Sequence, residues 1–242
     1  MGTRIILALD VDSKTRAISH VLTLKNDVAL FKVGKQLFTR YGPSVIRQVQ
    51  QAGGKVFLDL KFHDIPNTVA LACREAVRLG VNMLTIHATG GGSMMKAAVE
   101  SVQKASCEFK KRRPVILAVT VLTSISNDML KNELRCGLDI QDQVAWLAHL
   151  AQKAGVDGVV ASPEESVLIR KACGESFMIV TPGVRPEWAD KHDQKRVMTP
   201  LEAVKAGADY VVIGRPVISH SDPLLAVRMI NKELGVKSNC GR

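Results

Sequence analysis

Eight short runs of apolar, largely β-branched residues recur along the chain and alternate with segments of helical spacing. The runs cover residues 5–11, 29–34, 56–61, 83–88, 115–123, 158–161, 177–184 and 210–214. Their apolar positions are nearly continuous, without strict alternation, which is typical of strands buried on both faces of a parallel sheet. The pattern therefore predicts eight parallel strands, each connected to the next through a helix.

The helical spacing is clearest in the segment that begins at residue 140. Apolar residues follow there at i, i+4, i+7, i+8 and i+11: Ile140, Val144, Leu147, Ala148 and Ala151. Asp139 is the expected N-cap of this helix, and Gly155 is its expected stop. Glycines stand at equivalent helix-to-strand joints four times, at Gly53-Gly54, Gly80, Gly155 and Gly207.

Repeated strand–helix pairs without an intervening linker favour a closed (β/α)₈ barrel. We expect a single α/β domain of this kind over residues 1–242. An open, doubly wound sheet is the alternative, but no GxGxxG motif follows the first strand. In such a barrel the functional residues gather at the carboxyl ends of the strands.

Composition narrows the class of protein. Of 242 residues, 46% are apolar and 23% are charged, which is globular composition. The apolar runs are far shorter than the ~20 residues of a membrane span, and Asp10 precedes any segment long enough for a signal peptide. The five cysteines are scattered without a CxxC pair, so we expect reduced thiols and a cytoplasmic protein.

The formal net charge of +10 indicates an anionic partner. Aromatic residues for base stacking are few, at two Trp, two Tyr and six Phe. The one dense basic run, residues 110–113, ends just before an apolar strand and is interpreted as a solvated helix end. We therefore expect a small anionic substrate and no nucleic acid.

The densest polar cluster comes at the end of the third predicted strand. Asp59 and Lys61 are two residues apart and share a face, and Asp64 follows them. Lys32, on the neighbouring strand, extends the set to four alternating charges. Carboxylates and ammonium groups are tolerable at such a place only as a paired network. The network is either a buried structural ion-pair cluster or a catalytic one, and the other charged strand ends favour catalysis.

A second cluster follows the last two strands, where these barrels usually bind phosphate. Gly214 permits a close backbone approach to an anion, and Arg215 can bind an anion through two hydrogen bonds. Gly183 and Arg185 occupy the corresponding place after strand seven. The charged segment 185–200 is long enough for a lid over the site, with a mobile surface loop as the alternative.

Two histidines at the same rim are weaker candidates for a catalytic or metal-binding role. His87 ends the fourth predicted strand, and His63 lies within the charged cluster. Neither has a second ligand at metal-binding spacing, so His87 is interpreted as a hydrogen-bonded structural residue and His63 stays ambiguous.

These motifs resemble those of the orotidine 5′-phosphate decarboxylase family, in its short single-function form. The resemblance is strongest in residues 59–68, which read Asp-Leu-Lys-Phe-His-Asp-Ile-Pro-Asn-Thr. It continues in residues 7–10 (Leu-Ala-Leu-Asp), 31–34 (Phe-Lys-Val-Gly), 122–124 (Leu-Thr-Ser), 181–186 (Thr-Pro-Gly-Val-Arg-Pro) and 212–216 (Val-Ile-Gly-Arg-Pro). Together the segments span nearly the whole chain.

The resemblance implies decarboxylation of orotidine 5′-phosphate to uridine 5′-phosphate, without cofactor or metal, as the final step of pyrimidine nucleotide synthesis. It assigns Lys61 to the stabilisation and protonation of a C6 carbanion, with Asp59, Asp64 and Lys32 beside it. The implied substrate contacts are Asp10, Lys32 and Thr68 at the ribose, Thr123 at the pyrimidine, and Arg185, Gln194, Gly214 and Arg215 at the phosphate. It also implies a homodimer in which Asp64 and Thr68 reach the neighbouring subunit's site.

Two positions depart from the family pattern. His192 stands where a small residue is expected in the lid, and Ile218-Ser219 stand where a Thr is frequent. Competing interpretations are a Mg²⁺-dependent sugar-phosphate enzyme that shares D-x-K-x-x-D, a Schiff-base aldolase, and a non-catalytic RNA- or partner-binding barrel. Residues 65–68 do not resemble the sugar-phosphate enzymes, and a binding barrel would leave Asp59, Lys61 and Asp64 unexplained.

Overall fold

Eight parallel strands close into a barrel in which each strand pairs with the next along the chain, and the eighth pairs with the first. The structure is a computed structural model that describes residues 2–189 and 198–236. The strands are β1 (Ile5–Ala8), β2 (Leu30–Gly34), β3 (Val56–Phe62), β4 (Met83–His87), β5 (Val115–Val119), β6 (Gly158–Val160), β7 (Met178–Pro182) and β8 (Tyr210–Ile213). The predicted (β/α)₈ barrel is confirmed.

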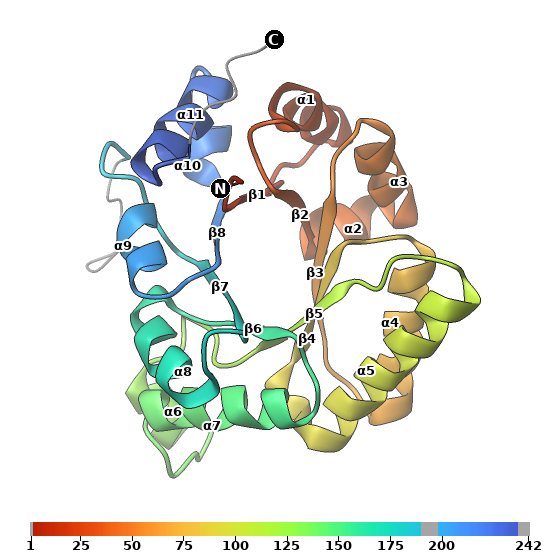
Figure 1. The fold of residues 1–242 in the computed structure, drawn as a ribbon, viewed down its shortest axis with the longest axis vertical. Helices are drawn as coiled ribbons and strands as arrows, with labels where there is room; N and C mark the ends of the chain where they lie inside the picture. The colour runs from red at the N-terminus through yellow and green to blue at the C-terminus, as the bar shows by residue number, and fades with distance from the viewer. Residues whose placement is uncertain (1, 190–197, 237–242) are drawn as a thin grey trace.

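Helices surround the barrel and separate its strands along the chain (Figure 1). In chain order they are α1 (Lys14–Leu24), α2 (Lys35–Tyr41), α3 (Pro43–Gln51), α4 (Pro66–Arg78), the 3₁₀ turn η1 (Ala88–Gly90), α5 (Gly91–Glu108), α6 (Asn127–Asn132), α7 (Ile140–Lys153), η2 (Pro163–Glu165), α8 (Ser166–Cys173), α9 (Pro200–Lys205), α10 (Arg215–Ile218) and α11 (Pro223–Glu233). In α7 the Asp139 side chain accepts a hydrogen bond from the Asp142 amide, so the predicted N-cap is confirmed.

Several strands are shorter at their carboxyl ends than the apolar runs predict. The run 115–123 ends as a strand at Val119, and the run 5–11 ends at Ala8. Val11 and Val121 are nevertheless buried, because the segments after these strands fold back over the helix–sheet core. An apolar run therefore marks buried chain rather than paired strand, and Thr123 lies in a rim loop.

The apolar residues form two separate layers. The larger layer lies between the sheet and the helices, and the smaller one fills the barrel interior. The interior layer contains Ile6, Ala8, Leu30, Phe57, Met83, Leu117, Val180 and Val212. On β6 the position of Gly158 requires glycine, because a Cβ there would clash with the backbone carbonyl of Met178 on β7. The interior packing closes the barrel below the rim and leaves the carboxyl ends of the strands for polar residues.

A repeated device stabilises the opposite end, where the strands begin. Asn82, Asp157 and Asp209 each stand one residue before an even-numbered strand. Their side-chain oxygens accept hydrogen bonds from the backbone amides of Val56 (2.9 Å), Ile116 (2.7 Å) and Ile179 (2.8 Å). Each side chain thus provides an acceptor for an amide near the start of the preceding strand, at the end of the barrel where the regular strand pairing begins.

Candidate active site

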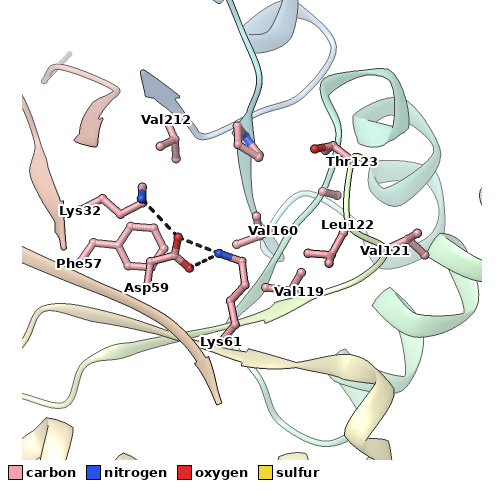
Figure 2. Close-up of a pocket in the computed structure, with 12 residues that line it drawn as sticks. Lys32, Phe57, Asp59, Lys61, Val119, Val121, Leu122, Thr123, Val160 and Val212 are labelled. Carbon is pink, nitrogen blue, oxygen red and sulfur yellow. Dashed lines mark hydrogen bonds and ion pairs between the residues drawn. The ribbon is translucent and has the colours of Figure 1, made fainter. Parts of the chain in front are cut away.

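Asp59 is the centre of the charged network at the carboxyl ends of β1–β3. Lys61 Nζ lies 2.8 Å from Asp59 Oδ1 and 2.9 Å from Oδ2. Lys32 Nζ lies 3.5 Å from Asp59 Oδ2 and 3.3 Å from Asp10 Oδ1. Figure 2 shows both ammonium groups converging on the Asp59 carboxylate. The structure therefore places four of the predicted residues together in the order Asp10, Lys32, Asp59, Lys61.

The environment of Asp59 decides its protonation state. Burial opposes ionisation of this carboxyl, but the ammonium groups of Lys32 and Lys61 and hydrogen bonds from Lys61 and Thr85 outweigh it. The pKa of Asp59 is therefore held below its ordinary value. At neutral pH Asp59 is therefore a carboxylate, held between the ammonium groups of Lys32 and Lys61.

The backbone at Lys61 departs from regular strand geometry. Its φ is +54°, a left-handed conformation that is unfavourable for a residue with a Cβ. The amide of Lys61 donates to the Thr85 hydroxyl on β4 at 2.9 Å, and that hydroxyl lies 3.0 Å from Asp59 Oδ1. Sequence reasoning missed Thr85, although it is a polar residue at an inward position of an apolar strand, two residues before His87.

A mostly apolar cavity of about 220 Å³ lies directly against the two lysines. Its lining residues are Lys32, Phe57, Asp59, Lys61, Val119, Val121, Leu122, Thr123, Val160, Ala161, Pro182 and Val212. Figure 2 shows the Lys61 ammonium group turned toward Asp59, with Val119 and Val160 beside the lysine side chain. An ammonium group beside apolar walls is poorly screened by water, so it interacts strongly with negative charge that forms in the cavity.

A second, more polar cavity of about 290 Å³ shares Lys32, Asp59, Pro182 and Val212 with the first. Its remaining lining residues come from the ends of β1, β7 and β8: Ala8, Asp10, Gly183, Val184, Arg185, Gly214, Arg215 and Pro216. Gly183 has a φ of +80°, which a side chain would strain. Two arginines and two glycines at one mouth suit an anion such as phosphate.

The two rim histidines lie against each other and beside the network. Their ring centroids are 5.3 Å apart. Burial, together with the nearby His63, Lys61 and Lys35, lowers the pKa of His87 to about 4, although Asp59 acts in the opposite direction. His87 is therefore neutral at physiological pH, and it adds no cation next to Lys61.

The described residues contain neither a cluster of metal ligands nor a helix that could span a membrane. Within residues 2–189 and 198–236, no group of three or more His, Cys, Asp or Glu side chains is arranged to hold a metal ion. Over the same ranges, no helix has the length and apolar character required to cross a membrane.

Comparison with known proteins identifies the family. Residues 3–230 match the model of the family described as orotidine 5′-phosphate decarboxylase / HUMPS. The chain belongs to this family. It is 52% identical over 231 residues to an orotidine 5′-phosphate decarboxylase of Syntrophotalea carbinolica, covering 96% of this chain and 94% of that one. Against the decarboxylase of Geotalea daltonii the identity is 53%, with coverage of 96% and 95%.

Solved structures agree with this assignment. The crystal structure of an orotidine 5′-phosphate decarboxylase from Lactobacillus acidophilus has a TM-score of 0.85 and 39% identity, and the match covers 96% of this chain and 99% of that one. The decarboxylase structure from Pyrococcus horikoshii has a TM-score of 0.76 at 27% identity, with coverage of 96% and 99%. The chain thus shares both the fold and the full length of these family members.

Not every residue expected from the decarboxylase family lies in the network. Asp64 and Thr68 are exposed, at the end of β3 and in the first turn of α4. Asp64 accepts a hydrogen bond from the Ile65 amide at 2.6 Å, and among the described residues it forms no ion pair with Lys61. The expected fourth charge of the alternating series is therefore absent from the site of a single subunit.

The predicted lid lies largely outside the described residues. Gln194 and His192 both fall in the segment 190–197, for which nothing is described. At its two ends the backbone amide of Arg185 donates to the carbonyl of Met198 at 3.0 Å, next to the arginine-lined cavity. Ser219, the other departure from the family pattern, is the exposed C-cap of α10.

Proposed function

We propose that this site decarboxylates orotidine 5′-phosphate to uridine 5′-phosphate with release of CO₂, the final step of de novo pyrimidine nucleotide synthesis. One observation carries the proposal. The Lys61 ammonium group is held by Asp59 at an apolar cavity that continues into a cavity lined by Arg185 and Arg215. The first cavity suits a pyrimidine ring and the second a phosphate, in a chain 52% identical to a named decarboxylase.

Lys61 supplies both the stabilising charge and the proton. Loss of CO₂ leaves an electron pair on C6 in the plane of the ring, where no adjacent group can delocalise it. The ammonium group, next to this carbon, stabilises the negative charge and then delivers a proton to C6. The apolar walls formed by Val119, Val160 and Leu122 strengthen this interaction, because they exclude the water that would screen it.

Asp59 and Lys32 hold the reacting groups. Asp59 binds Lys61 through both carboxylate oxygens and so fixes the position of the ammonium group. The Asp59 carboxylate also repels the substrate carboxylate beside it, and this repulsion is relieved as CO₂ leaves. Lys32 bridges Asp59 and Asp10, and we assign Lys32 and Asp10 to the ribose hydroxyl groups.

The remaining contacts provide binding energy away from the reacting carbon. We assign Thr123 to the pyrimidine edge and Arg185, Gln194, Gly214 and Arg215 to the 5′-phosphate. A very slow uncatalysed decarboxylation requires a barrier reduction of ~20 kcal/mol or more. One ion pair cannot supply that amount, so binding of the distant phosphate contributes at the transition state.

We propose that the reaction needs no cofactor or metal. The support is that the Asp59 oxygens are already engaged by the ammonium groups of Lys32 and Lys61, so a divalent cation would have to displace them. The test is the loss of orotidine 5′-phosphate absorbance with and without EDTA. Equal rates are expected. Loss of activity with EDTA that Mg²⁺ restores would overturn this proposal in favour of the magnesium-dependent mechanism of the rival enzymes.

We further propose a homodimer in which Asp64 and Thr68 complete the partner's site. Both residues are exposed in one subunit, and Ile65 between them is an exposed apolar residue, 67% accessible. Such a side chain suits an interface between subunits. The partner's carboxylate would then supply the fourth charge that the single subunit lacks.

Subunit mixing tests the shared site. Lys61→Ala and Asp64→Ala homodimers should each be nearly inactive. After subunit exchange, about half of the dimers are hybrids, and each hybrid has one site with both native residues, which gives about a quarter of wild-type activity. If both residues serve the same subunit's site, mixing restores nothing. A tagged subunit confirms that exchange has occurred.

We also propose that residues 1–242 work as one domain in the cytoplasm. The cysteines support this location, because Cys73, Cys107, Cys136 and Cys173 are all free thiols.

Trapping with borohydride in the presence of substrate distinguishes the proposed decarboxylation from the mechanism of a Schiff-base aldolase. No covalent adduct on Lys61 is expected.

A further inference from the structure

The ladder between β3 and β4 is interrupted where the catalytic lysine lies. Leu58 pairs with Leu84, and the next pair is Phe62 with Ile86. Four residue steps on β3 (62 − 58) therefore span only two steps on β4 (86 − 84). Residues 59–61 of β3 therefore face Thr85 alone, and they form a bulge with two additional residues that contains Asp59 and Lys61.

The bulge removes regular backbone pairing from Lys61 and leaves this residue with a φ of +54°. A left-handed conformation at a residue with a Cβ is kept only if its surroundings hold it. The amide of Lys61 also needs an acceptor, because a buried amide without one is unfavourable. The neighbouring strand β4 can meet both requirements, because it lies opposite the bulge.

Thr85 on β4 meets these requirements with a single hydroxyl group. Its side chain is completely buried, and the hydroxyl accepts from the Lys61 amide at 2.9 Å. The same hydroxyl donates its proton to Asp59 Oδ1 at 3.0 Å. The donor and one acceptor position of the hydroxyl are thus both used, one on the lysine's backbone and one on the lysine's counter-ion.

We propose that Thr85 is a positioning residue for the catalytic lysine, acting through the backbone of Lys61 and the carboxylate of Asp59. It holds the left-handed turn that aims the lysine side chain, and it fixes the rotation of the carboxylate that binds the ammonium group. This inference rests on the proposed role of Lys61 at C6. A displacement of the ammonium group by about 1 Å would misplace the charge and the proton and slow the reaction strongly.

The chain offers variants that isolate the hydroxyl group. Thr85→Val replaces the hydroxyl with a methyl group of similar size, and Thr85→Ser keeps the hydroxyl. Thr181→Val is the matched control. Thr181 is also a completely buried strand threonine, but its hydroxyl has no hydrogen-bond partner among the described residues.

Steady-state kinetics with orotidine 5′-phosphate provides the main measurement. Thr85→Val should lower kcat by about 30-fold with KM changed less than about threefold, because an interaction that positions the reacting group is lost while phosphate and ribose binding remain. Thr85→Ser and Thr181→Val should stay within about fivefold of wild type. If Thr85→Val does not fold, Thr85→Ala takes its place in the same comparison with Thr85→Ser.

A pH profile separates positioning from a general loss of structure. The hydroxyl is one of the groups that lower the pKa of Asp59, so its removal raises that pKa. The acidic limb of the kcat/KM profile should therefore move to higher pH in Thr85→Val and stay in place in Thr85→Ser and Thr181→Val. A purely structural role would lower kcat in proportion to the folded fraction and would leave this limb unmoved.

The outcomes are distinguishable from failure of the proposed function. An inactive Lys61→Ala together with a Thr85→Val enzyme of wild-type kcat and pH profile overturns the Thr85 inference alone. Thr85→Ser as slow as Thr85→Val also overturns it, because the hydroxyl would then not be the relevant group. A Lys61→Ala enzyme that keeps its activity overturns the proposed function itself.

Discussion

At the end of the barrel where the strands begin, Asp157 and Asp209 each combine an arginine with a strand amide. Arg113 lies 2.8 Å from Asp157, and Arg170 lies 2.6 Å from Asp209. Arg170 also donates to the carbonyl oxygens of Gly207, Gly174, Glu175 and Phe177. In these clusters each arginine pairs with the aspartate that precedes a strand, Arg170 also lies 4.0 Å from Glu175, and further guanidinium donors bind backbone carbonyls.

At the opposite end the same kinds of side chain are arranged differently. Asp59 is shared by Lys32 and Lys61, and within the described residues neither ammonium group donates to a backbone carbonyl. Both line the cavity of about 220 Å³. Lys61, moreover, has an unfavourable φ of +54°. At this end the ammonium groups keep hydrogen-bond donors for a ligand, and the backbone of Lys61 is strained.

Ion pairs occur at both ends of the barrel, so ion pairs alone do not mark a functional site. Arginine at the lower end, where the strands begin, is used for its fixed set of donors, which tie loops to strands. Lysine at the upper end presents a compact charge on a flexible stem that can face the substrate. We therefore expect substitutions at the two ends to separate activity from stability.

Loss of the catalytic ammonium group should have the largest effect. Lys61→Ala should lower kcat/KM by at least about 10⁴-fold, because stabilising charge and proton are lost together. Its unfolding midpoint should change little, since Asp59 keeps Lys32 and Thr85 as partners. Enzyme assay and urea unfolding on one preparation measure both. A variant within tenfold of wild type would remove Lys61 from the mechanism.

Removal of the phosphate-binding arginine should have the next largest effect. Arg215→Ala should lower kcat/KM for orotidine 5′-phosphate by about 10²- to 10³-fold, mainly through KM, because a charge-assisted anion contact is lost. With orotidine, which lacks the phosphate, turnover should be very slow and nearly the same in both enzymes. A large effect of Arg215→Ala on orotidine would contradict the phosphate assignment.

A substitution at the lower end should lower stability and leave activity nearly unchanged. Asp209→Ala should lower the free energy of unfolding by about 2 kcal/mol, because it leaves the Arg170 guanidinium and the Ile179 amide without this acceptor. The kcat and KM values should stay within about twofold of wild type. Asp209→Asn keeps an acceptor for the amide and should lose less. Urea unfolding measures the change, and a stable but inactive Asp209→Ala enzyme would contradict the division between the two ends.

The smallest expected effect concerns His87 at the upper end. Its pKa of about 4 lies below the ordinary value of 6.5, so the unfolded chain binds a proton more readily than the folded one. The stabilising contribution is complete above about pH 6.5 and is lost as the pH falls toward 4. With allowance for partial exposure, wild type should lose about 1 kcal/mol more than His87→Gln between pH 7.5 and pH 5. Equal losses in urea unfolding at the two pH values would contradict the neutral state of His87.

Local sequence patterns predict the elements of the barrel better than they predict where its strands end. All eight strands and the capped helix α7 could be predicted, because burial on both faces and helical periodicity leave local patterns. Strand ends were less accurate: residues 120–123 are apolar enough to resemble strand but lie in a rim loop. Hydrogen bonding defines a strand's end, and its partners are distant in sequence.

The sequence by itself determined the barrel, the family resemblance and the charged residues Lys32, Asp59 and Lys61 at the strand ends, since these depend on composition and short-range spacing. Only the tertiary structure decided that Lys61 takes a left-handed conformation bound by Thr85, 24 residues away. It likewise decided that Asp64 accepts a hydrogen bond from the Ile65 amide and forms no ion pair with Lys61 among the described residues, and that Arg170 reaches Asp209, 39 residues away. These contacts arise when the barrel closes and brings β3 against β4 and β7 against β8, so no local pattern in the sequence contains them.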